Sequence, residues 1–316
     1  GAFSGAQNSF ATFSSDLSAF AGQQVMIRWA FSSDPGAEEE GFYLDNIRID
    51  SASSAGQCEL KAITKNTAGP WYNPDQSGHG LFLEVSQGAN AAPDTITTYW
   101  YAFLNNQPVW ILGTGPTDGN SATLDMFVTD GAQSPPNFNS NDVNIIPWGE
   151  LDLDFDLQNN VTVSWDSVIT DFGSGSMDMT QLAFVSDSPK ACLSGSYSDP
   201  AQPGHGYVVE IIGSAGAEVV LVTWYNYDNN GNQIWLIGSA PLQGDTATVP
   251  VSLFEGGAFP PNFVPGDVTG QEWGTLELDF SRLNALTVSW TANLAGYSDG
   301  QVAATKLTEL KGRGCY

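Results

Sequence analysis

Cationic side chains are scarce in this sequence. Its 316 residues include 9 Lys and Arg against 35 Asp and Glu, which gives a net charge of -26. A field of that sign repels phosphate backbones and anionic lipid, so we expect no nucleic-acid partner. Long apolar runs are lacking too, because none approaches the roughly 18 residues that a membrane-spanning helix needs. We therefore expect no membrane insertion.

Residues and motifs that carry catalysis are equally sparse. The chain has 2 His, and it contains no His-Glu-x-x-His, Cys-x-x-Cys or Gly-x-Ser-x-Gly sequence. These absences disfavour a zinc enzyme and a serine hydrolase. Most carboxylates alternate with apolar residues along candidate strands, which is typical of a solvated face rather than of a catalytic acid and base. We therefore predict that the protein is not an enzyme.

The three cysteines, Cys58, Cys192 and Cys315, cannot all pair within one chain. Charged residues are 14% of the chain, and 34 Gly and 17 Pro supply turns, a composition typical of extracellular β proteins. We expect a secreted protein with one disulfide and one remaining thiol. Both Cys58–Cys192 and Cys192–Cys315 fit the spacing, and the second is slightly favoured because it closes one repeat unit on itself.

An internal duplication organises most of the chain. Trp235 follows Trp110 by 125 residues, and the other repeated segments have nearly the same offset. Those segments are Gly78-His79-Gly80 with Gly204-His205-Gly206, Trp100-Tyr101 with Trp224-Tyr225, Pro135-Pro136-Asn137-Phe138 with Pro260-Pro261-Asn262-Phe263, and Val163-Ser164-Trp165 with Val288-Ser289-Trp290. A period this long indicates two homologous domains, 58–187 and 188–316, rather than a solenoid.

Each unit has the pattern of an antiparallel β domain. In Leu151-Asp152-Leu153-Asp154-Phe155-Asp156-Leu157, apolar and acidic residues alternate with the period of a strand. Further strands are predicted near 81–85, 96–103, 109–113, 122–128, 161–165 and 176–182, with hairpin turns at Asn105-Asn106 and Asn230-Gly231. About seven sequential strands predict an all-β meander that closes as a barrel or a sandwich.

The first fifty residues differ from both repeats. Two strands are predicted at 25–31 and 42–49, and a third within 2–13, followed by a linker at 51–57. The stretches Asp16–Trp29 and Gly41–Ile49 resemble the closing half of MAM-like and carbohydrate-binding-module-like jelly rolls, so residues 1–50 are interpreted as a partial jelly roll. The repeats resemble tandem accessory units near the C-termini of secreted Gram-negative bacterial proteins, which implies secretion and an accessory role.

Aromatic residues and histidines are the candidate ligand contacts. Exposed Trp and Tyr rings stack on sugars, and in a Trp-Tyr pair on a strand one ring faces inward and the other outward. The candidate set is Trp71, Tyr72, His79, Trp224, Tyr225 and His205. The alternatives are a core position for each Trp and a structural turn position for each His, whose flanking glycines permit unusual dihedral angles.

A structural Ca²⁺ is the expected cofactor. The acidic residues around the loop at 33–41 supply the oxygen ligands that this ion prefers. The candidate ligands are Asp34, Glu38, Glu40 and Asp45. Jelly rolls of the kind resembled hold a calcium ion near this region, which is what the resemblance implies here. The segment Asp228–Asn232 lacks the spacing of an EF-hand and is interpreted as a hairpin turn.

Two functions follow from these observations. The first is a secreted, non-catalytic structural or adhesive protein, assembling into filaments when a neighbouring chain adds a strand to the incomplete N-terminal domain. Its partner would be another copy of the same chain. The second is a glycan-binding C-terminal accessory module of a secreted hydrolase, with a surface glycan as its partner.

Overall fold

The structure is a computed structural model that describes residues 15, 63–156 and 159–315. The chain divides into two units, Gly1–Cys58 and Glu59–Tyr316, and the second contains both sequence repeats. The predicted jelly-roll strands, the linker at 51–57 and the four proposed calcium ligands lie outside the described residues.

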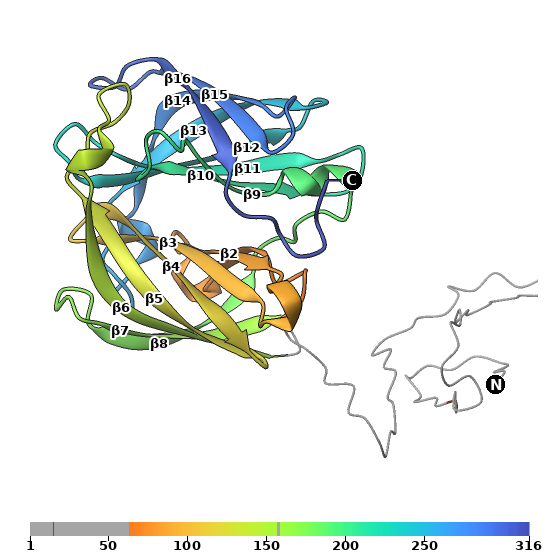
Figure 1. Cartoon of the computed structure of the whole chain (residues 1–316). Coiled ribbons are helices and arrows are strands. Elements are labelled where there is room, and N and C mark those ends of the chain that lie inside the picture. The colour runs from red at the N-terminus through yellow and green to blue at the C-terminus, as the bar shows by residue number, and fades with distance from the viewer. Residues whose placement is uncertain (1–14, 16–62, 157–158, 316) are drawn as a thin grey trace, which may run out of the picture. The chain divides into compact units, whose positions relative to one another are not determined.

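Each repeat closes into an eight-stranded antiparallel barrel (Figure 1). The N-terminal barrel consists of β1 (Gly69–Tyr72), β2 (Gly80–Ser86), β3 (Thr95–Leu104), β4 (Gln107–Asp118), β5 (Ser121–Asp130), β6 (Asn144–Phe155), β7 (Asn160–Ser167) and β8 (Ser174–Gln181). The C-terminal barrel consists of β9 (Gly195–Ser198), β10 (Gly206–Ile212), β11 (Val219–Tyr227), β12 (Gln233–Pro241), β13 (Thr246–Glu255), β14 (Thr269–Asp279), β15 (Ala285–Ala292) and β16 (Gly300–Lys306).

Short 3-10 helices lie between the strands. They are η2 (Pro74–Gln76), η3 (Ala89–Ala91), η4 (Ser140–Asp142), η5 (Pro189–Leu193) and η6 (Pro265–Asp267). The prediction of an all-β fold with two homologous antiparallel meander domains is thus confirmed, and of the two predicted closures, barrel or sandwich, both domains adopt the barrel.

The strands that close the barrels are the ones that the sequence pattern did not reveal. β1 pairs with both β2 and β8, and β9 pairs with both β10 and β16. Each has 4 residues, which is too short for a period of two to stand out. Closure removes the free sheet edges that a seven-stranded meander would expose.

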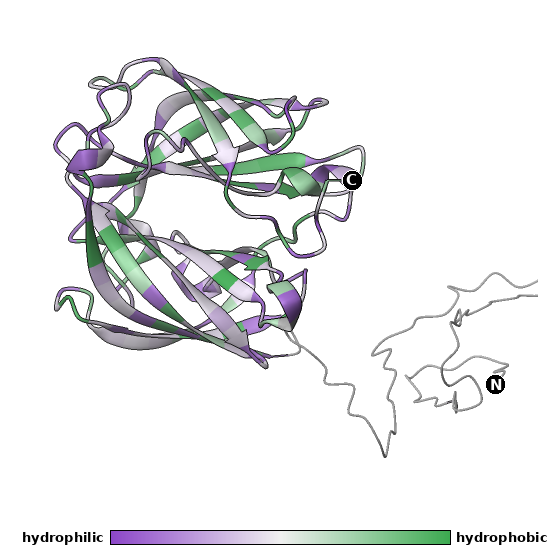
Figure 2. Ribbon diagram, viewed as in Figure 1, coloured by the Kyte–Doolittle hydropathy of each residue, from purple (hydrophilic) through white to green (hydrophobic). Residues whose placement is uncertain are grey.

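Hydrophobic and hydrophilic residues both occur along the strands (Figure 2), and their alternation determines which side chains fill each barrel. On β6, Leu151, Leu153 and Phe155 are buried, while the Asp residues between them are exposed, as the pattern predicts. The predicted hairpin at Asn105-Asn106 is also present, with φ angles of 52° and 66°. Both values are those of a type I′ turn, which matches the twist of the flanking strands.

Tryptophans occupy equivalent places in the two barrel cores. Trp100 packs edge-on against Trp148 and Trp165, with ring centroids 6.0 and 5.4 Å apart. Trp224 contacts Trp273 and Trp290 at 5.6 and 4.9 Å in the C-terminal barrel. Edge-to-face aromatic pairs stabilise beyond their burial, so the repeated Trp positions are explained by packing.

The C-terminal tail returns from β16 to the N-terminal barrel. The Lys311 backbone N–H donates to the Val85 carbonyl at 2.7 Å, and the Lys311 ammonium pairs with Asp94. Arg313, whose side chain is 3% exposed, pairs with Asp187 and donates to the Val185 carbonyl at 3.0 Å. The tail is therefore held by buried and ionic contacts as well as by the disulfide.

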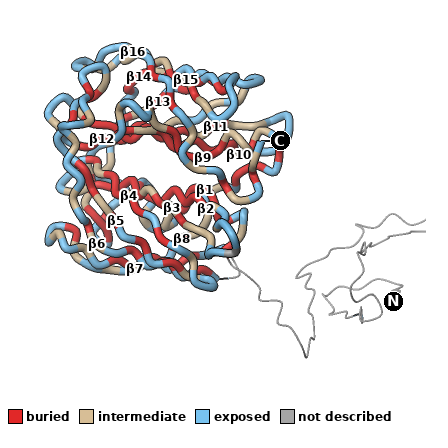
Figure 3. The backbone as a smooth tube through the Cα atoms, in the orientation of Figure 1, coloured by how far each residue is buried: buried red, intermediate tan, exposed pale blue. Residues whose placement is uncertain are grey.

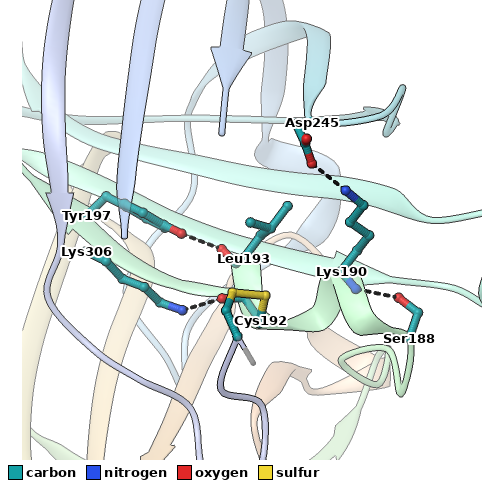
Figure 4. Close-up of a disulfide and its surroundings, with 8 residues drawn as sticks. Ser188, Lys190, Cys192, Leu193, Tyr197, Asp245 and Lys306 are labelled. Carbon is teal, nitrogen blue, oxygen red and sulfur yellow. Dashed lines mark hydrogen bonds and ion pairs between the residues drawn. A yellow bond between two sulfur atoms is a disulfide. The ribbon is translucent and has the colours of Figure 1, made fainter. Parts of the chain in front are cut away.

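Cys192 and Cys315 form the disulfide that the sequence analysis favoured, with Cα atoms 5.0 Å apart (Figure 4). Cys192 lies on η5 in the connection between the barrels, and its carbonyl accepts a hydrogen bond from the Lys306 ammonium at 2.6 Å. The bond joins residues 123 positions apart. It thereby closes the C-terminal barrel with its tail into one covalent loop.

Removal of this disulfide is expected to lower stability without unfolding the protein. Cys192→Ser with Cys315→Ser should cost about 2–4 kcal/mol, because the unfolded chain regains the freedom of a long loop while the tail keeps its other contacts. Urea unfolding in a Cys58→Ser background would measure this as a lower midpoint with a steeper slope, because the unfolded chain exposes more surface without the cross-link. An unchanged midpoint would show that the tail contacts alone suffice.

Candidate functional site: the interface between the barrels

Outward-facing residues of both barrels are buried where β2–β4 meet β10–β12 (Figure 3). Aromatic residues dominate this contact, which we call the interbarrel core. Its buried members are Phe82, Tyr101, Phe103, Trp110, Ala132, Phe138, Val208, Tyr225, Tyr227, Trp235 and Phe263. A core of this kind holds the two barrels together as one body rather than as two domains joined only by a linker.

Backbone hydrogen bonds cross the interface in matching pairs. The Gly131 N–H donates to the Gly231 carbonyl at 3.0 Å, and the Gly256 N–H donates to the Asn106 carbonyl at 3.0 Å. The two bonds join equivalent positions of the repeats, with donor and acceptor barrels exchanged. The barrels are therefore related by a local two-fold pseudosymmetry at this interface.

Tryptophan indole groups also donate hydrogen bonds across the interface in a matching pair, one from each barrel. Trp110 Nε1 donates to the Asn226 carbonyl at 3.2 Å, and Trp235 Nε1 donates to the Ala102 carbonyl at 3.1 Å. Asn226 and Ala102 hold equivalent positions on β11 and β3. The repeated Trp of each unit is thus a contact to the other unit, which explains its recurrence without a ligand.

The two histidines lie at the edge of this core. His79 Nδ1 accepts a hydrogen bond from Trp100 Nε1 at 3.4 Å, and His205 Nδ1 accepts one from Trp224 Nε1 at 3.3 Å. With Nδ1 as acceptor, each neutral imidazole carries its proton on Nε2. Neither Nε2 atom has a hydrogen-bond partner among the described residues.

Each imidazole packs edge-on against a phenylalanine of the opposite barrel. The His79 and Phe263 ring centroids are 4.7 Å apart, and those of His205 and Phe138 are 4.5 Å apart. Gly78 has a φ of 133°, and a Cβ there would lie 2.9 Å from the Phe263 ring. The Gly-His-Gly motif recurs because the interface needs a small residue and a flat ring there.

Burial also sets the charge state of the histidines. Desolvation lowers the pKa of His79 and of His205 from 6.5 to about 4. A neutral imidazole enclosed by rings has no route to a substrate, and each lies in a separate half of the interface. The structural-turn alternative from the sequence analysis therefore fits their placement.

The aromatic residues proposed to stack on sugars are mostly enclosed. Trp71 is 2% exposed and packs against Phe155 in the N-terminal barrel, and Trp224 is 0% exposed in the C-terminal barrel. Tyr225 is 3% exposed in the interbarrel core, whereas Tyr72 is partly exposed. Three of the four rings thus offer no face to a sugar, and their placement does not support the predicted ligand-binding role.

Two buried glutamates are candidate functional residues that the sequence patterns did not reveal. Glu84 on β2 is 1% exposed, and Glu210 on β10 is 2% exposed. They hold equivalent positions in the two repeats and face outward from their own barrels. A single carboxylate inside Leu-Phe-Leu-Glu-Val and again inside Val-Val-Glu-Ile-Ile was the available signal.

Glu84 is contacted from the C-terminal barrel and its tail. Ser196 Oγ donates to Glu84 Oε2 at 3.2 Å and also lies 3.0 Å from Thr308 Oγ1. Desolvation raises the Glu84 pKa to about 7, although hydrogen bonds from Thr308 and Ser196 and the charge of Lys306 act in the opposite direction. Oε1 of Glu84 has no partner among the described residues.

Glu210 lies in the same polar region of the interface. Desolvation raises its pKa well above the usual value, and the negative charge of Glu84 raises it further. Glu210 Oε2, Thr223 Oγ1 and the Tyr225 hydroxyl are buried without a hydrogen-bond partner in the described chain. Burial raises the pKa of Tyr99, which stacks on Tyr225 at 5.2 Å across the interface.

A cavity of about 270 Å³ lies beside the disulfide at one end of the C-terminal barrel. It is lined by apolar side chains, Arg282 and the ion pair of Lys190 with Asp245. None of the residues proposed from sequence as ligand contacts lines it. Within the described ranges, no group of three or more His, Cys, Asp or Glu is placed to hold a metal ion.

Comparisons with known proteins found no match to a family model, to a curated protein or to a solved structure. No helix in the described part of the chain is long and apolar enough to cross a membrane. The geometry of the interface is therefore the main basis for a functional proposal.

Proposed function

We propose that this chain is a secreted, non-catalytic structural or adhesive protein whose two barrels serve as one rigid body in an extracellular assembly. The observation that carries the proposal is the interbarrel core. Trp110, Trp235 and both histidines pack against the opposite barrel, and the other repeated Trp residues fill the cores of their own barrels.

Rigidity is the property that an assembling subunit needs. Successive copies add with a constant rotation and translation only if the two ends of each copy keep a constant relation. Paired backbone hydrogen bonds and the returning C-terminal tail restrict motion between the barrels, and the disulfide anchors that tail to the connection between them. A disulfide also fits an oxidising compartment, which supports secretion.

Residues 1–50 are the proposed joint of the assembly. Their sequence is interpreted as half of a jelly roll, and a strand supplied by a neighbouring copy would complete its sheet. This part of the proposal, including calcium binding at the acidic loop, rests on sequence alone, because these residues lie outside the described structure.

Electron microscopy of the purified full chain tests the proposal, first with calcium and then with a chelator. Regular filaments are expected, and deletion of residues 2–13 should abolish them while near-ultraviolet circular dichroism reports two folded barrels. Discrete monomers in every condition would contradict the structural role. Filaments that survive the deletion would contradict strand donation but not the structural role.

A further inference from the structure

The proposed structural role does not explain the polar region around Glu84 and Glu210 in the interface. Both side chains face outward from their own barrels and are nonetheless buried, and Glu84 accepts a hydrogen bond from Ser196 of the opposite barrel. Four buried oxygens lack a hydrogen-bond partner among the described residues, namely those of Glu84 Oε1, Glu210 Oε2, Thr223 Oγ1 and Tyr225 OH. Unpartnered buried polar groups are costly, and a buried carboxylate is costlier than a carboxylic acid.

The groups that face the two carboxyls come from several elements. The one cationic neighbour of Glu84 among the described residues is Lys306 of β16. The Lys306 ammonium already donates a hydrogen bond to the Cys192 carbonyl and also interacts electrostatically with Glu309. The remaining titratable neighbours are tyrosines, namely Tyr99 and Tyr101 on β3, Tyr197 on β9 and Tyr225 on β11. Burial raises the pKa of each, so they stay neutral.

Loss of a proton by Glu84 therefore places a negative charge between the barrels with one nearby cation. Its second oxygen has no donor, and Glu210 lies close enough for the two charges to oppose each other. Separation of the barrels would return the carboxylate to water. With both groups protonated, that driving force is absent.

We propose that Glu84 and Glu210 form a proton-operated lock, which holds the two barrels together when both carboxyls are protonated and loosens when Glu84 ionises. The site takes protons as its ligand, and its two halves come from the two repeats. The lock confers a response to external pH on the body, which goes beyond the proposed structural role.

Hydrogen exchange of the full-length protein tests the lock. The amides of Asn106, Gly131 and Gly256 bond across the interface and report its opening, whereas amides within the barrel sheets report unfolding. Glu84→Gln keeps the side-chain size but cannot lose a proton. The control is Glu150→Gln, an exposed glutamate on β6.

For each protein, hydrogen exchange gives an equilibrium constant for opening of the interface. The constant of the unmodified protein divided by that of Glu84→Gln should rise about tenfold per pH unit from pH 4.5 to 7 and then level off. The histidines are present in both proteins, so their contribution cancels. For Glu150→Gln the same ratio should stay near one. A ratio that does not change with pH overturns the lock, as does an equal change at amides within the barrels.

A direct titration keeps the proposal falsifiable if Glu84→Gln folds poorly. Carbon-13 NMR of the glutamate-labelled protein should show one carboxyl titrating near pH 7 that is absent in Glu84→Gln or, failing that variant, in Glu84→Asp. If every carboxyl titrates near its ordinary value of about 4.3, the buried groups carry no proton at neutral pH and the lock is overturned.

Discussion

Replacement of Phe259 by alanine should lower the free energy of unfolding by about 3–5 kcal/mol, a large effect for a residue outside every strand. Phe259 belongs to the β13–β14 connection of the C-terminal barrel but lies in the core of the N-terminal barrel. Its ring is 4.8 Å from that of Trp100 and 4.9 Å from that of Phe172. Truncation would leave a cavity among rings that cannot collapse into it.

Phe259 belongs to the C-terminal barrel, but its replacement should destabilise the N-terminal barrel first. Hydrogen exchange should accelerate most at amides of β3, β6 and β7, and the urea midpoint should fall. Phe184→Ala is the matched control, because that ring is 50% exposed and its loss should cost little. Equal effects of the two substitutions would show that Phe259 is not part of the core.

The insertion of Phe259 also breaks the symmetry of the repeats. Its equivalent in the first repeat is Ser134, which accepts a hydrogen bond from Asn226 Nδ2 at 3.0 Å instead of entering a core. The C-terminal barrel has Tyr207 where the N-terminal barrel has Leu81, and Tyr207 stacks on Trp224 at 5.3 Å. The C-terminal barrel thus fills its core with its own Tyr207, whereas the N-terminal barrel has the smaller Leu81 and is filled by Phe259 from the C-terminal barrel.

The second large effect is a reversal of pH dependence between two variants. A histidine whose pKa falls from 6.5 to about 4 on folding stabilises fully above pH 6.5 and loses that contribution as the pH falls to 4. Glu84, whose pKa rises to about 7, stabilises fully below about pH 4.5 and loses its contribution as the pH rises to 7. Each shift corresponds to about 3 kcal/mol.

The histidine pair and the glutamate pair change stability in opposite directions over the same pH range. The free energy of unfolding of the unmodified protein should therefore depend only weakly on pH between 4.5 and 6.5. Glu84→Gln with Glu210→Gln should leave the histidines unopposed, and stability should fall on acidification by about 3 kcal/mol per histidine. His79→Gln with His205→Gln should reverse the trend, with stability falling as the pH rises toward 7.

Urea unfolding at several pH values measures both variants against the unmodified protein. The exposed pair Glu150→Gln with Glu277→Gln is the control and should follow the unmodified protein, because both side chains lie in solvent rather than in the interface. Parallel profiles for all four proteins would contradict the buried charge states assigned to the interface.

Local patterns predicted most of the architecture. The duplication followed from repeated segments such as Gly-His-Gly, and the strand of Leu151, Leu153 and Phe155 followed from alternation. The duplication and the strand depend on residues close in sequence, or on copies of the same segment, so no three-dimensional information was needed. For the disulfide, the sequence favoured Cys192–Cys315 only slightly over Cys58–Cys192, and the structure decided between them.

The candidate site could not be predicted in the same way. Alternation predicted that one ring of the Trp224-Tyr225 pair faces into the barrel and the other faces outward. It did not predict that Tyr225, the outward ring, is buried by the other barrel. The same holds for Glu84 and Glu210. A period of two tells which way a side chain points from its own sheet. Whether that direction leads to water depends on what covers the sheet, and here contacts between residues more than 100 positions apart decided it.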